Sequence, residues 1–237
     1  MITLQDAPGR LPRGHRVYAI GDIHGCLDRL RTLHAAIEAD VAARPVQSPL
    51  LVHVGDYVDR GPDSAGVVRL LAAGDPVHGV PTVNLMGNHE RTMIDALEGI
   101  GPSATDWMIS GGREALASWG GDPDAPRTSW PAHVPPPDMA FLRGLALRHQ
   151  VGSYLFVHAG IRPGVALGAQ TEQDMITIRN SFLYSEQDFG VVVVHGHTPR
   201  IAPEIRFNRI GIDTGAVFNG KLTCAVLEAD QIGFLQA

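Results

Sequence analysis

Three short stretches decide the fold of this chain: Gly21-Asp22-Ile23-His24-Gly25, Gly55-Asp56-Tyr57-Val58-Asp59-Arg60-Gly61 and Gly87-Asn88-His89-Glu90. Each follows a run of apolar, β-forming residues. Asp22 and Asp56 are 34 residues apart, and Asp56 and Asn88 are 32 apart. A strand, a crossover helix and the next parallel strand need upwards of about 30 residues. The stretches are therefore predicted to end three parallel strands at one sheet edge, where α/β folds place their ligands.

Apolar patterning between these stretches predicts alternating strands and helices. The runs before the stretches are almost continuously apolar, as in strands that are covered on both faces, and apolar residues recur at helical spacing from Leu27 to Val41. The expected strands span residues 17–22, 50–56 and 80–87, and the expected helices span residues 27–43, 64–73 and 89–97.

The rest of the chain predicts an insertion and a second sheet. All three tryptophans, Trp107, Trp119 and Trp130, lie between residues 99 and 137, which predicts a Trp-rich insertion over the sheet edge, either a small apolar core or a substrate surface. A helix is expected at 138–147 and strands at 154–158, 191–195, 205–213, 221–228 and 232–235, the last three in a second sheet. We expect an α/β fold, a two-sheet αββα sandwich, in one domain (17–237) after an N-terminal tail (1–16).

Composition argues against several classes of function. The formal net charge is −6 and no basic run occurs, which disfavours a surface that holds DNA or RNA. Lys221 is the only lysine, which leaves no P-loop. Cys26 and Cys224 lie in dissimilar contexts, so a reduced compartment without disulfides is expected. No apolar segment has the length of a signal-peptide core or a membrane span, so we expect a soluble, cytoplasmic protein.

Six residues at predicted strand ends have the chemistry to bind a pair of divalent metal ions: Asp22, His24, Asp56, Asn88, His158 and His197. Asp22 and His24 are separated by one residue and could bind one ion. Asp56 could bridge two ions about 3.5 to 4 Å apart. Asn88, His158 and His197 would complete the coordination of the second ion. Mn²⁺ is the expected metal, although mixed nitrogen and oxygen ligands also accept Fe, Zn and Co.

The motifs resemble those of a known family. The three stretches, together with His158-Ala159-Gly160 and Gly196-His197-Thr198, are similar to the signature elements of the calcineurin-like metallophosphoesterases. They resemble most closely the phosphoprotein phosphatase branch, which includes bacterial and phage serine/threonine phosphatases. The resemblance runs in order from about residue 17 to residue 228, and it implies the αββα sandwich of the metallophosphoesterase type.

This resemblance implies a mechanism and assigns residue roles. It implies the same six metal ligands with Asp56 bridging, His89 as a general acid oriented by Asp59, and phosphate binding by Arg60 and Arg179. A hydroxide held between the ions would attack the phosphoserine or phosphothreonine of a protein substrate directly. Because an alkoxide is a poor leaving group, protonation by a nearby imidazole would matter.

Several alternatives remain open at this stage. Arg179 lies in a neighbourhood that departs from the family pattern, so Arg162 or Arg200 could be mistaken for it, and a structural salt bridge is an alternative role. His53 and His195 lie inside apolar strands and are expected to be buried, hydrogen-bonded histidines rather than ligands, with His195 a weaker alternative ligand.

Two rival functions also remain. A dinucleoside polyphosphate hydrolase, acting for example on diadenosine tetraphosphate, is disfavoured because those relatives typically carry Ala at the position of Asp59 and Asp at the position of Glu90. Glu90 is instead interpreted as a carboxylate in the first turn of a helix. A non-catalytic metal-binding protein that docks a partner through the insertion would not need His89, Asp59 and Arg60 together. A cysteine phosphatase is excluded because Thr32, not arginine, lies six residues after Cys26.

Overall fold

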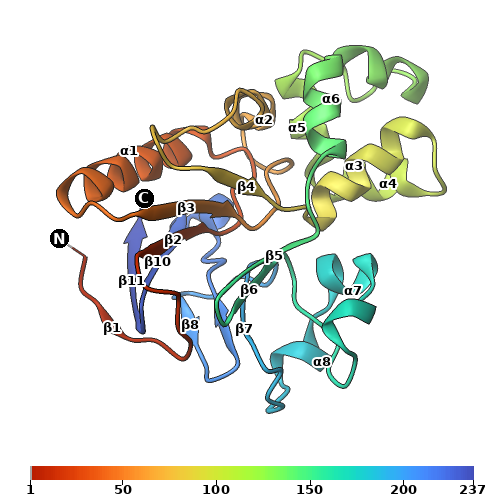
Figure 1. Cartoon of the computed structure of the whole chain (residues 1–237). Coiled ribbons are helices and arrows are strands. Elements are labelled where there is room, and N and C mark those ends of the chain that lie inside the picture. The colour runs from red at the N-terminus through yellow and green to blue at the C-terminus, as the bar shows by residue number, and fades with distance from the viewer. Residues whose placement is uncertain (1) are drawn as a thin grey trace.

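The computed structural model describes residues 2–237 and contains two β-sheets packed face to face, with helices on their outer faces (Figure 1). In spatial order, the six-stranded sheet consists of β1 (Gln5–Asp6), β11 (Gln231–Gln236), β10 (Thr223–Glu228), β2 (His15–Ile20), β3 (Ser48–His53) and β4 (Thr82–Asn84). The five-stranded sheet consists of β5 (Arg148–Val151), β6 (Tyr154–Val157), β7 (Val192–His195), β9 (Arg209–Gly211) and β8 (Glu204–Ile205). Strands β2, β3 and β4 are parallel, and so are β6, β7 and β9.

The α-helices are α1 (Leu27–Ala43), α2 (Ser64–Ala72), α3 (Asn88–Glu98), α4 (Ser103–Trp107), α5 (Arg113–Ser118), α6 (Pro136–Arg143), α7 (Glu172–Thr177) and α8 (Asn180–Leu183). A π-helical turn, η1 (Met108–Gly112), joins α4 to α5. The connections also contain the 3₁₀ segments η2 (Arg127–His133), η3 (Leu167–Ala169) and η4 (Ala216–Phe218).

Side-chain alternation along the strands produces the layers. In β2, Val17 and Ala19 point into the core between the two sheets, whereas Tyr18 and Ile20 pack on the other side against α1 and α2, because successive strand residues face opposite sides of a sheet. On the second sheet, Leu155 and its neighbours pack outward against α7 and α8. The two-sheet αββα sandwich expected from the sequence is confirmed.

The last strands belong to different sheets from those expected. Residues 205–213 form two short strands, β8 and β9, that do join the second sheet. Strands β10 and β11 were expected beside them but extend the first sheet, where Ala225 of β10 lies opposite Ala19 of β2 in antiparallel register. That expectation was wrong because alternation identifies a strand but does not identify its partner.

The described part of the expected tail, residues 2–16, packs against the domain. Gln5 and Asp6 form β1, which pairs with β11, and Leu11 is buried in the core between the sheets. Strand β2 begins at His15, two residues earlier than expected. The sequence did not predict β1, because this segment is polar and interrupted by Pro and Gly, and two residues are too few to show a period.

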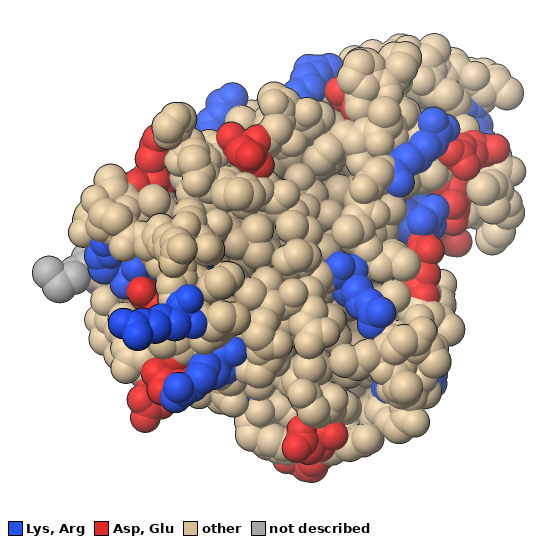
Figure 2. Space-filling model, in the orientation of Figure 1, with Lys and Arg blue, Asp and Glu red and all other residues tan. Residues whose placement is uncertain are grey.

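The Trp-rich insertion forms a group of short helices that pack against α3 and α2, in the yellow and green part of Figure 1. Trp107, Trp119 and Trp130 are all buried within the same apolar cluster as α1, α2 and α3. The insertion therefore extends the core, as the first of the two interpretations expected. Acidic and basic side chains are interspersed on the face shown in Figure 2. None of the helices in residues 2–237 combines the length and the apolarity that crossing a bilayer requires.

Candidate active site

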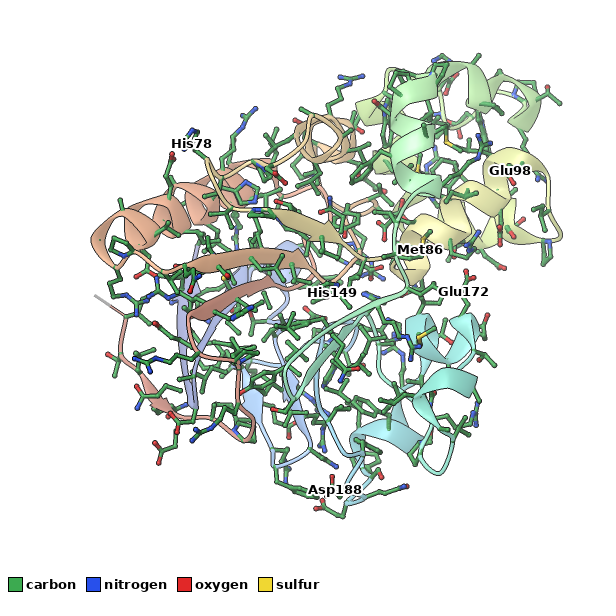
Figure 3. The ribbon with its side chains drawn as sticks, viewed as in Figure 1. His78, Met86, Glu98, His149, Glu172 and Asp188 are labelled. Atoms are coloured by element: carbon green, nitrogen blue, oxygen red, sulfur yellow. The ribbon has the colours of Figure 1, made fainter. Side chains whose placement is uncertain are left out.

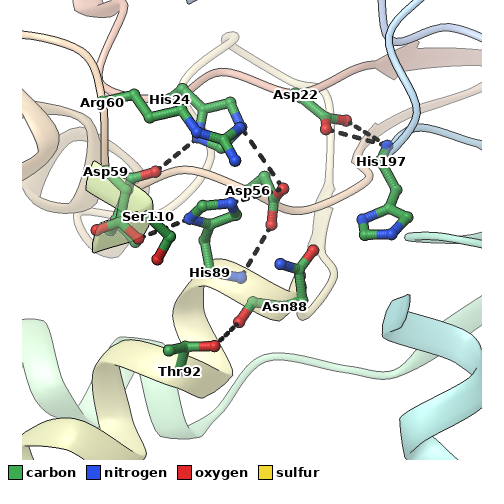
Figure 4. A network of polar contacts seen from close by, with 12 residues as sticks. Asp22, His24, Asp56, Asp59, Arg60, Asn88, His89, Thr92, Ser110 and His197 are labelled. Carbon is green, nitrogen blue, oxygen red and sulfur yellow. Dashed lines mark hydrogen bonds and ion pairs between the residues drawn. The ribbon is translucent and has the colours of Figure 1, made fainter. Parts of the chain in front are cut away.

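The predicted site residues come together at one edge of the two sheets, and Figure 4 shows Asp22, His24, Asp56, Asn88, His89 and His197 among them. They follow the ends of five parallel strands: Asp22 and His24 after β2, Asp56 after β3, Asn88 after β4, His158 after β6 and His197 after β7. The structure therefore gathers all six side chains that the sequence proposed as ligands. Both sheets contribute, because the parallel strands of each end at this edge.

The loops that carry these residues have unusual backbone conformations. His24, Asp56, Asp59, Arg60 and His197 have positive φ values of 43°, 53°, 73°, 66° and 67°. Such left-handed conformations are disfavoured for residues with a side chain and persist only when the surrounding structure holds them. Their concentration in the first two motifs and the Gly196-His197-Thr198 element marks the edge as a candidate functional site.

The buried carboxylate of Glu90 holds two of the loops. Its Oε1 accepts hydrogen bonds from the backbone N–H groups of Tyr57 (2.7 Å) and Val58 (3.1 Å), and its Oε2 accepts from those of Asp56 (2.9 Å) and Gly87 (3.0 Å). Burial, with the charge of Asp56, raises the pKa of Glu90 to about 7, while the four donors favour the ionised form. Glu90 lies in the first turn of α3, as expected, and its bracing of the loops is a role that the sequence did not reveal.

Two clusters of potential metal ligands share Asp56. One contains His24, Asp56 and His89, and the other contains Asp56, His158 and His197; in each, the candidate ligand atoms lie within 4.8 Å of one another. Asn88 adds an amide oxygen 3.1 Å from His158 Nε2. Asp56 therefore has the position that a bridging carboxylate requires.

The remaining predicted ligand, Asp22, approaches the second cluster. Its two carboxylate oxygens accept hydrogen bonds of 3.1 and 3.0 Å from the backbone N–H of His197. The Nε2 atom of His197 is buried and has no hydrogen-bond partner within residues 2–237. Because His197 also belongs to the second ligand cluster, this unpaired buried nitrogen is available to an ion bound there.

The electrostatics of the site also suit bound cations. Burial raises the pKa of Asp22 well above its usual value, and the charges of Asp213 and Asp56 add to the effect. Burial lowers the pKa values of both His24 and His197 to about 3, which leaves their imidazoles neutral and able to coordinate. Crowded carboxylates beside neutral imidazoles are a donor set suited to divalent ions.

Two of the candidate metal ligands, Asp56 and His158, form a charged pair. Burial opposes ionisation of Asp56, but the charges of His158 and His89 outweigh it and lower the pKa of Asp56 well below its usual value. Burial also opposes protonation of His158, yet the negative charge of Asp56, 3.3 Å away, raises the pKa of His158 to about 10. A bound cation would replace this proton, because ligating histidines are neutral.

His89 and Asp59 form a close buried pair. His89 Nδ1 lies 2.6 Å from Asp59 Oδ2. The other ring nitrogen, Nε2, faces Asp56 and lies 4.0 Å from the carboxylate of Asp56. Burial opposes the charged imidazole, but the negative charges of Asp56 and Asp59 prevail and raise the pKa of His89. The pair is therefore arranged so that Asp59 fixes the orientation of a protonated His89.

Arg60 and Arg179 line one cavity of about 190 Å³ together with His24 and His197. The Arg60 guanidinium lies 5.4 Å from the ring centroid of Phe218, over its face, an arrangement that favours a cation. Two arginines, whose guanidinium groups are suited to oxyanions, therefore lie beside the ligand clusters.

The other arginines that could be mistaken for Arg179 lie elsewhere. Arg162 forms an ion pair with Asp174, with Nε 2.9 Å from the carboxylate. Arg200 lines a different groove, of about 730 Å³, beside Arg206 and Arg209. Only Arg179 of these candidates lines the cavity that holds Arg60.

The two histidines that were expected to be structural are buried and hydrogen-bonded. His53 lies between His34, with 3.0 Å between the Nε2 atoms, and Asn84 Oδ1, which is 2.8 Å from Nδ1. His195 is hydrogen-bonded through Nδ1 alone, which lies 3.1 Å from the carbonyl oxygen of Gly196, while its buried Nε2 has no partner within residues 2–237. Neither belongs to the ligand clusters found among residues 2–237.

Sequence reasoning missed Asp213 and Trp107. Asp213 is buried and lines the same cavity as Arg60, and its place just after β9 repeats the strand-end pattern that located Asp22 and Asp56. Trp107 donates a hydrogen bond from its indole to Asp59, with a distance of 2.8 Å. Only its concentration with other tryptophans near the motifs pointed to it.

The family is shown by a match over nearly the whole chain. Residues 15–231 match the family model described as calcineurin-like phosphoesterase. The chain therefore belongs to the calcineurin-like phosphoesterase family and is a hydrolase of the metallophosphoesterase type, with candidate metal-ligand clusters where this chemistry needs them.

Particular relatives differ in the substrates that their names state. The chain is 28% identical over 218 residues to an asymmetrical bis(5'-nucleosyl)-tetraphosphatase, PrpE, from Halalkalibacterium halodurans, covering 86% of this chain and 87% of that protein. It is 29% identical to a symmetrical bis(5'-nucleosyl)-tetraphosphatase from Methylococcus capsulatus, covering 62% of this chain and 44% of that protein. It is 36% identical to serine/threonine-protein phosphatase 1 from Salmonella typhimurium, covering 40% of this chain and 38% of that protein.

The chain therefore spans less than half the length of the last two relatives. Among solved structures, one described as a candidate diadenosine tetraphosphatase has a TM-score of 0.68 at 24% identity, with 94% of both chains covered. A cold-active protein-tyrosine phosphatase from Shewanella has a TM-score of 0.61 at 16% identity, covering 94% of this chain and 80% of that one. At these identities the structures share the fold.

Proposed function

We propose that this protein is a metal-dependent phosphomonoesterase that hydrolyses phosphoserine and phosphothreonine in proteins. The observation that carries the proposal is the 2.6 Å contact between His89 and Asp59. A serine or threonine alkoxide is a strongly basic leaving group, so its departure depends on a proton donor. A buried imidazole that a carboxylate orients is suited to this task.

In this proposal, six side chains would hold two divalent ions, preferably Mn²⁺: Asp22, His24, Asp56, Asn88, His158 and His197. Bound ions would lower the pKa of a water molecule and stabilise the negative charge that develops on the phosphate oxygens. Arg60 and Arg179 bind the phosphate oxygens and orient the monoester. His89 donates the proton on Nε2 to the leaving oxygen, while Asp59 holds Nδ1 and stabilises the imidazolium.

Hydrolysis of dinucleoside tetraphosphates is the second candidate. It is favoured by the likeness to the tetraphosphatase PrpE over 86% of this chain. A nucleotide is a less basic leaving group than an alkoxide and needs less help from a proton donor. The His89–Asp59 pair therefore supports the monoesterase more strongly than this alternative.

A comparison of substrates tests the choice. The Mn²⁺-loaded protein should hydrolyse a phosphoserine peptide faster than diadenosine tetraphosphate, and the reverse order would favour the tetraphosphatase. Treatment with a chelator should abolish p-nitrophenyl phosphate hydrolysis and Mn²⁺ should restore it. Full activity of the stripped protein would contradict the metal requirement.

Substitution of the proton donor tests the mechanism. His89→Asn should lower kcat on the phosphoserine peptide on the order of 10² or more. The loss should be smaller on p-nitrophenyl phosphate, whose leaving group needs little protonation. An unchanged rate on the peptide would show that another group donates the proton.

A further inference from the structure

The Trp-rich insertion contacts Asp59 and Arg60 through the short segment Trp107–Gly112. The side chain of Trp107 is fully buried, and its Nε1–H donates a 2.8 Å hydrogen bond to Asp59 Oδ1. The other carboxylate oxygen, Oδ2, lies 2.6 Å from His89 Nδ1. Each oxygen of Asp59 therefore has one side-chain partner, one from the insertion and one from the proposed proton donor.

The same segment also holds the residue after Asp59. The backbone N–H of Arg60 donates a 3.0 Å hydrogen bond to the carbonyl oxygen of Gly111. Asp59 and Arg60 have left-handed φ values of 73° and 66°, a conformation that needs support from its surroundings. The backbone N–H of Asp59 finds a further partner 3.0 Å away in Ser64 Oγ.

The segment can approach this closely because it contains two glycines. A Cβ atom on Gly111, whose φ is +113°, would lie 2.5 Å from the backbone nitrogen of Arg60. A Cβ atom on Gly112 would lie 2.7 Å from the ring of Trp107. Both distances are too short for real side chains, so the fit between the insertion and the Asp59–Arg60 turn depends on glycine.

We propose that Trp107 is a positioning residue: its indole N–H fixes the Asp59 carboxylate so that Asp59 in turn orients His89 toward the leaving group. This inference rests on the proposed role of His89 as proton donor. A carboxylate with one oxygen unbound could rotate and tilt the imidazole, whereas two partners on opposite oxygens fix its plane. Hydrogen bonds to a charged acceptor are also stronger than those to a neutral one.

The insertion provides a matched control for the test. Trp119 is also buried, and its indole donates a 2.8 Å hydrogen bond to another buried carboxylate, that of Asp138. Trp107→Phe and Trp119→Phe therefore remove the same donor from the same part of the fold. Only the first change removes a partner of Asp59.

The activity test compares two leaving groups. Trp107→Phe should lower kcat on a phosphoserine peptide on the order of tenfold, with a much smaller effect on p-nitrophenyl phosphate. Trp119→Phe should keep the wild-type ratio of the two rates. A Trp107→Phe loss that is equal on both substrates would overturn the proposal, because damage to the fold or to metal binding lowers both rates together.

A spectroscopic test needs no metal and no turnover. In metal-free protein, Trp107→Phe should move the ¹⁵N resonance of His89 Nδ1, and Trp119→Phe should leave it in place. Conversely, Asp59→Asn should move the indole N–H resonance of Trp107 and not that of Trp119, a measurement that remains available if Trp107→Phe fails to fold. An unmoved Trp107 indole resonance would overturn the proposal.

The two proposals fail in distinguishable ways. If His89→Asn lowers the rates on both substrates equally, His89 is not the proton donor and the catalytic role of Trp107 fails with it. If His89→Asn shows the leaving-group dependence and Trp107→Phe does not, only the positioning role of Trp107 is overturned.

Discussion

Replacement of Glu90 with glutamine should destabilise the protein far more than most changes that preserve size. Two backbone N–H groups bond to each carboxylate oxygen of Glu90. Glutamine keeps one oxygen and places an NH₂ group at the other position, where it faces two buried donors. Glu90, whose pKa is about 7, is ionised at about pH 8, and each lost hydrogen bond to a charged acceptor is worth about 1.5 to 3 kcal/mol. At that pH we therefore expect the free energy of unfolding to fall by about 3 to 6 kcal/mol.

Urea unfolding followed by circular dichroism would measure this loss, with metal-free protein used throughout so that binding does not add to stability. Glu98→Gln provides the control, because Glu98 ends the same helix α3 (Figure 3) and its carboxylate pairs with Arg143, whose side chain is 56% exposed. Exposed ion pairs contribute about 0 to 1 kcal/mol. If Glu90→Gln were no more destabilising than Glu98→Gln, the bracing of the loops by Glu90 would be refuted.

Three further predictions concern single side chains. Arg179→Ala should raise the KM for p-nitrophenyl phosphate on the order of tenfold by removing a charged contact to phosphate, and Arg162→Ala should not, as steady-state kinetics can check. Gly111→Ala should raise the same KM on the order of tenfold by displacing Arg60, the residue after Asp59 that is proposed to bind phosphate. Gly120→Ala should leave the KM unchanged, because nothing lies within 4 Å of the added Cβ at this position, where φ is +79°. Burial opposes ionisation of Asp40, but hydrogen bonds from its arginine and tyrosine partners prevail and lower its pKa. The ionised Asp40 therefore stabilises the folded protein at pH values above the unfolded pKa of about 3.9. This stabilisation is lost as the pH falls through the lower pKa of the folded protein. The difference in unfolding free energy between wild type and Asp40→Asn, measured by urea titration at several pH values, should thus be largest at neutral pH and shrink below about pH 4.

The parallel half of the fold could be predicted from the sequence because its signals are local. Each apolar strand ends in a motif, and the spacing of Asp22, Asp56 and Asn88 allows one helix between successive strands. The structure shows those helices, and α1 begins and ends at the residues expected, Leu27 and Ala43. The candidate metal ligands could be predicted from the sequence for the same reason, since parallel strands all end at one edge of their sheet. Their roles as metal ligands remain predictions that the chelation test addresses.

The antiparallel additions could not be predicted in the same way. Strand β10 pairs with β2 across about 200 residues of chain, with Glu228 opposite Arg16, and nothing in its own residues identifies that partner. Arg16 is buried, and its Nε donates a 2.9 Å hydrogen bond to Glu228. A charged residue such as Arg16 within a buried strand indicates that a polar partner lies nearby in the fold, but the sequence does not identify that partner.

Glu90 and Trp107, whose contacts sequence reasoning missed, share a physical property. Three of the four backbone N–H donors to Glu90, and the carboxylate that accepts from Trp107, lie 30 or more residues away in the chain. Neither residue belongs to a periodic pattern. Patterns reveal groups that must share a face, whereas a buried polar side chain is specified only by the partner that satisfies it. Its loss leaves a donor or acceptor unpaired, so its cost is large although its sequence signal is small. The ligand set of such a site is therefore easier to predict than the contacts that orient it, and those contacts are where substitutions should separate proton donation from metal binding.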